Sequence, residues 1–100
     1  MNDERSSEGL RTPEVDDLVS TLSRMHDEEA MFALMQDLFT IREIQETSQR
    51  LAVARMLDEG QPSAAIEKAT GASATTIARV SKCLSYGAGG YRAALDICAR

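Results

Sequence analysis

The chain has few of the residues that thicken a core or build a metal centre. Its 100 residues contain no tryptophan, two phenylalanines, two tyrosines, two cysteines and one histidine. Cys83 and Cys98 cannot form a disulfide framework, and His26 alone cannot complete a tetrahedral zinc site with them. We therefore expect no metal. Two thiols and a polar start without an apolar leader predict a reducing, cytoplasmic location.

Long apolar runs and β-alternation are absent as well. No apolar stretch approaches the roughly eighteen residues that span a membrane, so no membrane partner is expected. No nucleophile, base and orienting group occur together, so the sequence predicts no enzyme. What remains is apolar spacing typical of helices, which predicts an all-α fold.

Helix start and stop signals divide the chain. Residues 1–11 have the composition of a disordered tail, and residues 12–100 are expected to form a single domain. Thr12 and Pro13 predict a capped helix start, and Thr40 with Glu43 predicts a capping box before the longest helix. The expected helices are 13–26, 28–39, 41–58, 62–69, 73–84 and 91–99.

Negative charge is concentrated in the first part of the chain. The net charge is −5, but residues 1–60 carry six Lys/Arg against fourteen Asp/Glu, whereas residues 61–100 carry five against two. The overall negative charge of an acidic protein repels nucleic acid. The basic part is nevertheless compatible with a local DNA-facing surface.

The stretch TGASATTIARVSKCL, residues 70–84, joins a helix stop to a new helix start. Gly71 suits a left-handed turn residue, and Ser73 suits an N-cap. A short helix, a glycine-containing turn and a second helix form the helix-turn-helix pattern, here about 62–84. The residues expected on its inner face are Ile66, Ala69, Ile77, Val80 and Leu84.

The outer face of the second helix carries small and hydroxylated side chains. Such residues let a helix end approach base edges, and threonine offers a hydrogen bond and a methyl contact. Lys68 and Lys82 are candidate phosphate contacts. Because any helical bundle can contain a similar corner, the pattern alone leaves DNA binding and plain packing open. The outer-face candidates are Ser73, Ala74, Thr75, Thr76 and Arg79.

Three segments carry a family resemblance. FTIREIQETSQRLAVARMLDEG, IEKATGASATTIARVSKCL and SYGAGGY together resemble the Trp-repressor superfamily, in particular its YerC/YecD branch. The resemblance covers nearly all of residues 15–97, and GASATTIARV followed by CLSYGAGGY is its most specific part.

The resemblance implies a six-helix chain in an intertwined homodimer. It implies a sequence-specific DNA-binding transcription regulator, most simply a repressor, that reads a palindromic operator in double-stranded DNA. The two reading helices of such a dimer lie about one DNA turn apart, about 34–36 Å. The alternative is a dimeric interaction module of the same fold with weak or lost DNA binding, which the acidic charge and the Ala64-Ala65 pair favour.

The resemblance also implies a possible effector pocket. In the Trp repressor the corepressor lies between two arginines, and the matching positions are Arg50 and Arg79, with Thr40 matching the threonine that starts the central helix. The residue after the second arginine is glycine in the Trp repressor and Val80 here. L-tryptophan, another small effector or no ligand therefore remain open, and no cofactor is expected. For Arg50, an ion pair with Glu46 or a solvated position is the simpler interpretation.

Overall fold

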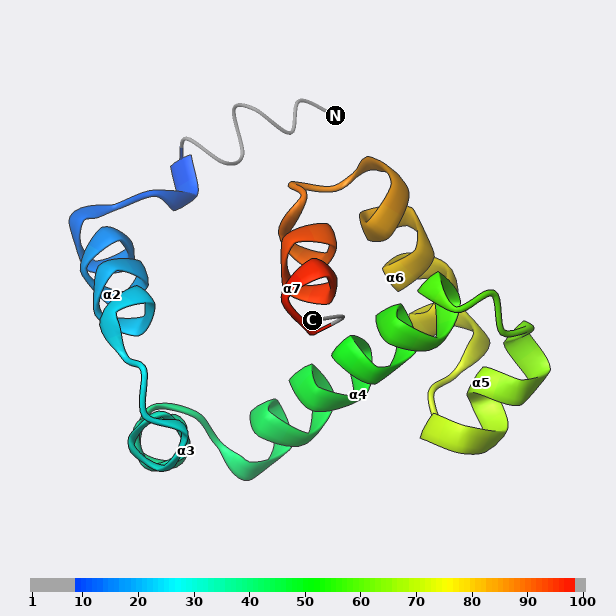
Figure 1. Cartoon of the computed structure of the whole chain (residues 1–100), viewed down its shortest axis with the longest axis horizontal. Coiled ribbons are helices and arrows are strands. Elements are labelled where there is room, and N and C mark those ends of the chain that lie inside the picture. The colour runs from blue at the N-terminus through cyan, green and yellow to red at the C-terminus, as the bar shows by residue number, and fades with distance from the viewer. Residues whose placement is uncertain (1–8, 99–100) are drawn as a thin grey trace. The chain divides into compact units, whose positions relative to one another are not determined.

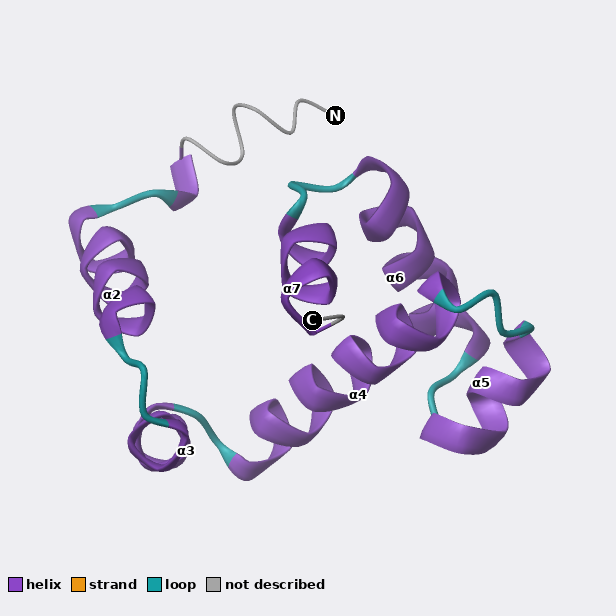
Figure 2. Cartoon of the chain, viewed as in Figure 1, coloured by secondary structure: helices purple, strands orange, loops and turns teal. Residues whose placement is uncertain are grey.

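The computed structural model describes residues 9–98 and is all-helical in that range (Figures 1 and 2). The predicted disordered tail lies largely outside the described residues. By its contacts the chain divides into two compact units, residues 1–40 and 41–100, which are described separately. The expectation of a single domain over residues 12–100 stays a prediction. The helices are α2 (Pro13–Arg24), α3 (Glu28–Leu38), α4 (Ile41–Asp58), α5 (Ser63–Thr70), α6 (Ala74–Tyr86) and α7 (Gly90–Cys98).

The first unit contains α2 and α3, which begin as their sequences predict. The Thr12 side chain accepts a hydrogen bond from the Val15 amide, and Pro13 occupies the start of α2. Asp27 caps α3 through the Glu29 amide. Helix α2 ends at Arg24, with Met25 as its C-cap, rather than at His26. Neither helix contains a buried residue, so in the single chain their apolar stripes are at most half-buried.

In the second unit α4 is the central element (Figure 1). Helices α5, α6 and α7 all contact α4, and α6 also contacts α5 and α7. The core consists of the residues that these helices turn toward one another. Its buried members are Val53, Ala54, Ile66, Ala72, Ile77, Val80 and Leu95.

Most of the predicted inner face of the helix-turn-helix is confirmed, with one error. Ile66, Ile77 and Val80 are buried, and Leu84 packs against the core. The prediction that Ala69 faces inward was wrong. Ala69 is exposed, and Ala72 in the turn is buried instead. The shift arises because the turn folds back over the core after α5 ends, so a turn residue replaces a helix residue there.

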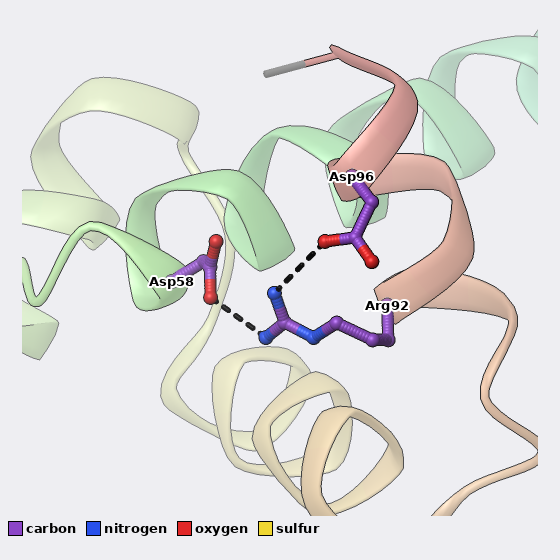
Figure 3. A network of polar contacts seen from close by, with 3 residues as sticks. All are labelled: Asp58, Arg92 and Asp96. Carbon is purple, nitrogen blue, oxygen red and sulfur yellow. Dashed lines mark hydrogen bonds and ion pairs between the residues drawn. The ribbon is translucent and has the colours of Figure 1, made fainter. Parts of the chain in front are cut away.

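Helix α7 is joined to α4 by a charged network as well as by Leu95 (Figure 3). The Arg92 guanidinium lies 2.7 Å from the Asp58 carboxylate of α4 and 3.8 Å from Asp96, one turn later on α7. The hydrogen bond from Arg92 lowers the pKa of Asp58, and the same bond raises the pKa of Arg92. A side chain from the last helix thus fixes its position on the central one.

Candidate nucleic-acid interface

A three-residue turn separates α5 from α6. Gly71 has φ 75°, in the left-handed region where a side chain would be strained, as the sequence predicted. The Thr70 hydroxyl donates to the Ile66 carbonyl at 2.7 Å and accepts from the Ala72 amide at 3.1 Å. One side chain therefore satisfies a backbone carbonyl of α5 and a backbone amide within the turn, and only three residues separate the two helices.

A second contact holds this turn from outside. The Gln49 amide nitrogen, on α4, donates to the Thr70 carbonyl oxygen at 3.0 Å. The carbonyls in the last turn of a helix have no partner within that helix, so they need one elsewhere. Sequence reasoning missed Gln49, because a glutamine inside a long helix gives no signal of a tertiary contact.

Helix α6 starts with the serine cap that the sequence predicts. The Thr76 amide donates to Ser73 Oγ at 3.1 Å, and Ser73 Oγ donates to Thr76 Oγ1 at the same distance. Ser73 Oγ thereby both accepts and donates, whereas Thr76 Oγ1 only accepts and keeps its hydrogen as a donor. Thr75, by contrast, is exposed, and its side chain makes no hydrogen bond within residues 9–98.

The outward face of α6 is polar and basic. Thr75, Arg79 and Lys82 follow one another at four- and three-residue spacing, which places them on one side of a helix. All three are exposed, as is Ala74 beside them, whereas Ile77 and Val80 on the opposite side are buried. The same helix therefore packs with one face and presents a stripe of hydroxyl, guanidinium and ammonium groups with the other.

The remaining predicted contact, Lys68, lies exposed in the last turn of α5. From the start of α5 to the end of α6, residues 63–86, the chain carries three Lys/Arg and one Asp/Glu, Glu67. The helix-turn-helix is thus the basic part of an acidic protein. Basic groups gathered on one helix face are typical of a surface that contacts phosphates.

The predicted effector residues occupy different environments. Arg50 is half-buried on α4 and donates to Thr47 Oγ1 at 3.4 Å rather than pairing with Glu46. Arg79 is exposed, and Val80 is only 1% exposed within the core. Thr40 belongs to the first unit. A pocket formed by these four residues stays a prediction.

An open hollow of about 260 Å³ lies along α4. Its lining is charged and polar: Arg42, Gln45, Glu46 and Gln49. None of these was predicted to bind a ligand. Within the described range no cluster of His, Cys, Asp or Glu is arranged to hold a metal, and no described helix is long and apolar enough to cross a membrane.

Comparison with known proteins supports this geometry. The family model of the Trp repressor protein matches residues 13–98. The uncharacterized protein YerC of Bacillus subtilis (strain 168) is 48% identical over 87 residues, which cover 87% of this chain and 84% of YerC.

Two solved structures share the fold. A Staphylococcus aureus protein described as a "putative Trp repressor" is 38% identical with a TM-score of 0.86, covering 92% of both chains. A TrpR-like protein from Eubacterium eligens ATCC 27750 is 35% identical with a TM-score of 0.87, covering 92% of this chain and 95% of that one. The helix-turn-helix between α5 and α6 and these matches lead to one conclusion: the chain belongs to the Trp repressor protein family.

Proposed function

We propose that this protein is a sequence-specific DNA-binding transcription regulator, most simply a repressor, which acts as a homodimer through α6. Membership of the Trp repressor family indicates a helix-turn-helix regulator rather than an enzyme. The observation that carries the finer proposal is the exposed stripe of Thr75, Arg79 and Lys82 on a helix whose opposite face is buried.

Different residues of the interface have different roles in this proposal. Thr75 is exposed and has an uncommitted hydroxyl, so it reads base edges together with the small Ala74. Ser73 and Thr76 are hydrogen-bonded to each other and fix the start of α6, and Thr76 keeps its hydroxyl hydrogen as a donor for DNA. Lys68, Arg79 and Lys82 contact phosphates, which position the helix and make affinity depend on salt.

The uncovered helices support a dimer. Phe32 and Leu38 of α3 are 52% and 49% exposed, and Val19 of α2 is 44% exposed. Apolar stripes of this size are normally covered in a stable protein. A second copy related by two-fold symmetry covers them with the same surface and places two α6 helices on a palindromic site.

An effector site is the least constrained part of the proposal. Thr40, Arg50, Arg79 and Val80 remain the predicted residues, with L-tryptophan or another small molecule as ligand. Val80 lies in the core, so the ring of a ligand bound between Arg50 and Arg79 would have to lie outside the core. Isothermal titration with L-tryptophan checks this, and binding at millimolar affinity or tighter supports the pocket. The cytoplasmic location also stays a prediction.

Selection of bound fragments from genomic DNA tests the function. The enriched fragments are then titrated by fluorescence anisotropy at two salt concentrations, with and without excess non-specific competitor. The regulator proposal predicts enriched palindromic fragments whose binding survives the competitor. The interaction module, favoured by the net charge of −5 and the exposed Ala64 on α5, predicts no enrichment and no binding that resists the competitor.

A further inference from the structure

We infer that Gln49 is a positioning residue for DNA reading: its amide fixes the turn of the helix-turn-helix against α4 and thereby sets where α6 begins. The inference rests on the proposed DNA-binding function. Gln49 itself lies on α4, outside the reading helix.

The contact between Gln49 and the turn is specific. Gln49 is half-buried, and its side-chain nitrogen donates to the Thr70 carbonyl at 3.0 Å across twenty-one residues of sequence. A Cβ atom built on Gly71 would lie 3.9 Å from the same nitrogen, so the glutamine amide lies in van der Waals range of the turn. The hydrogen bond therefore joins α4 to the last residue of α5, directly beside the turn glycine.

Thr70 passes this constraint on to α6. Its hydroxyl donates to the Ile66 carbonyl and accepts from the Ala72 amide, at 2.7 and 3.1 Å. Ala72 is buried and directly precedes Ser73, the cap of α6. The chain of contacts runs from Gln49 through Thr70 and Ala72 to the first turn of the reading helix.

The fold itself does not depend on this chain of contacts. Ile66, Ile77 and Val80 pack with Val53 and Ala54 of α4, and this apolar core holds α5 and α6 in place. Apolar packing is not directional, whereas a hydrogen bond has a preferred distance and angle. Loss of the Gln49 bond should thus leave the helices formed but loosen the turn. Because specific base contacts need precise placement, such loosening lowers discrimination between DNA sequences more than general affinity.

Gln49→Leu tests the inference, because it removes the donor and keeps a side chain of similar volume. Gln45→Leu is the matched control: Gln45 lies one turn earlier on α4, is exposed, and makes no side-chain hydrogen bond within residues 9–98. Gln49→Lys restores a donor. Two quantities are measured: amide hydrogen exchange at Ala72, and the ratio of affinities for the selected site and for non-specific DNA.

For Gln49→Leu we expect about tenfold faster exchange at Ala72 and an affinity ratio reduced about five- to tenfold, as for one lost hydrogen bond with an unpaired carbonyl. The salt dependence of binding should stay unchanged, since no phosphate contact is removed. Gln45→Leu should match the wild type, and Gln49→Lys should recover most of the protection. If Gln49→Leu does not fold, Gln49→Glu with Gln45→Glu as control replaces it.

The outcomes separate the two proposals. Wild-type exchange and a wild-type affinity ratio in Gln49→Leu would overturn the inference and leave the DNA-binding function intact. Faster amide exchange at Ala72 with an unchanged affinity ratio would also overturn the inference. Gln49 would then hold the turn, but the turn would have no effect on the discrimination between DNA sequences. A wild-type protein that selects no DNA would overturn the proposed function, and with it the role of Gln49 in reading.

Discussion

At the scale of single residues, Lys82 and Thr75 share the exposed stripe of α6 but belong to different kinds of contact. Lysine is a point charge that attracts any phosphate, whereas threonine recognises a base by a hydrogen bond and a methyl group. Their two chemistries can therefore be separated by substitution, without any change to the buried face of the helix.

We expect Lys82→Ala to weaken binding to all DNA sequences alike. The variant releases one counterion fewer when it binds. The slope of log affinity against log salt concentration should therefore become less steep by about one unit. Thr75→Ala is the control: it should leave that slope unchanged and alter the preferred base at its position. Anisotropy titrations at several salt concentrations measure both. An unchanged slope in Lys82→Ala would remove this lysine from the phosphate contacts.

Gly87 lies at the C-terminal end of α6, at a position where a larger residue would not fit. It follows the last residue of α6, and a Cβ atom there would overlap the Cys83 carbonyl group. We expect Gly87→Ala to lower the free energy of unfolding by about 1–3 kcal/mol, the cost of overpacking. Urea unfolding at fixed protein concentration measures it. Gly90→Ala is the control, because a Cβ there meets nothing within 4 Å; equal stability of the two variants would refute the assignment.

At the scale of elements, sequence signals located the helices well where they act locally. Thr12 and Ser73 both cap the helices they were expected to cap, because a cap depends only on a residue and the next three amides. Gly71 marked the turn for the same reason. Local signals also placed six of the seven predicted interface residues on the exposed surface, all but the half-buried Thr76, since spacing along a helix determines its faces.

Contacts between elements were not predictable. The Gln49 bond to Thr70 spans twenty-one residues and that from Arg92 to Asp58 spans thirty-four, and nothing in either pair's local sequence indicates the partner. Val80 illustrates the same limit: its spacing indicated an inward side chain and its family position indicated a ligand pocket. Only the packing of α6 shows how deeply it lies in the core.

The link between α4 and α7 predicts a pH dependence. Because the Arg92 hydrogen bond lowers the pKa of Asp58 below its ordinary 3.8, the folded state favours the ionised carboxylate. Its contribution to stability is therefore fully present above the unfolded-state pKa and is lost as pH falls through the lower folded-state value. We expect the urea midpoint of the wild type to fall more between pH 5 and pH 2 than that of Asp58→Asn. Asp96→Asn, which leaves the 2.7 Å contact in place, should follow the wild type; identical pH profiles for wild type and Asp58→Asn would contradict the assignment.

At the scale of the whole molecule, the proposed function requires two copies of the chain. Helices α2 and α3 have no buried residue, and the described part of one chain covers their apolar side chains only in part. A dimer also supplies the second reading helix that a palindromic site requires. In the proposed dimer, the acidic first part of the chain would serve assembly and the basic second part would contact DNA.

Sedimentation equilibrium tests the assembly. We expect twice the 10.9 kDa chain mass at micromolar concentration. Phe32→Glu, which places a charge on the exposed apolar face of α3, should raise the dimer dissociation constant at least about tenfold, since burial of a phenylalanine contributes about 1.5–3 kcal/mol. Ala33→Glu, at an exposed position on the side of α3 that faces away from its apolar stripe, is the control. A wild-type chain that stays monomeric would contradict the dimer.

The spacing of the two half-sites tests the central claim most directly, namely that a two-fold dimer reads DNA with two copies of α6. The affinity for the selected palindrome is compared with that for the same half-sites separated by five additional base pairs, which turns one half-site to the opposite side of the duplex. The account predicts that this insertion lowers affinity at least about 100-fold, to the level of non-specific DNA. Equal affinity for the two sites would contradict it.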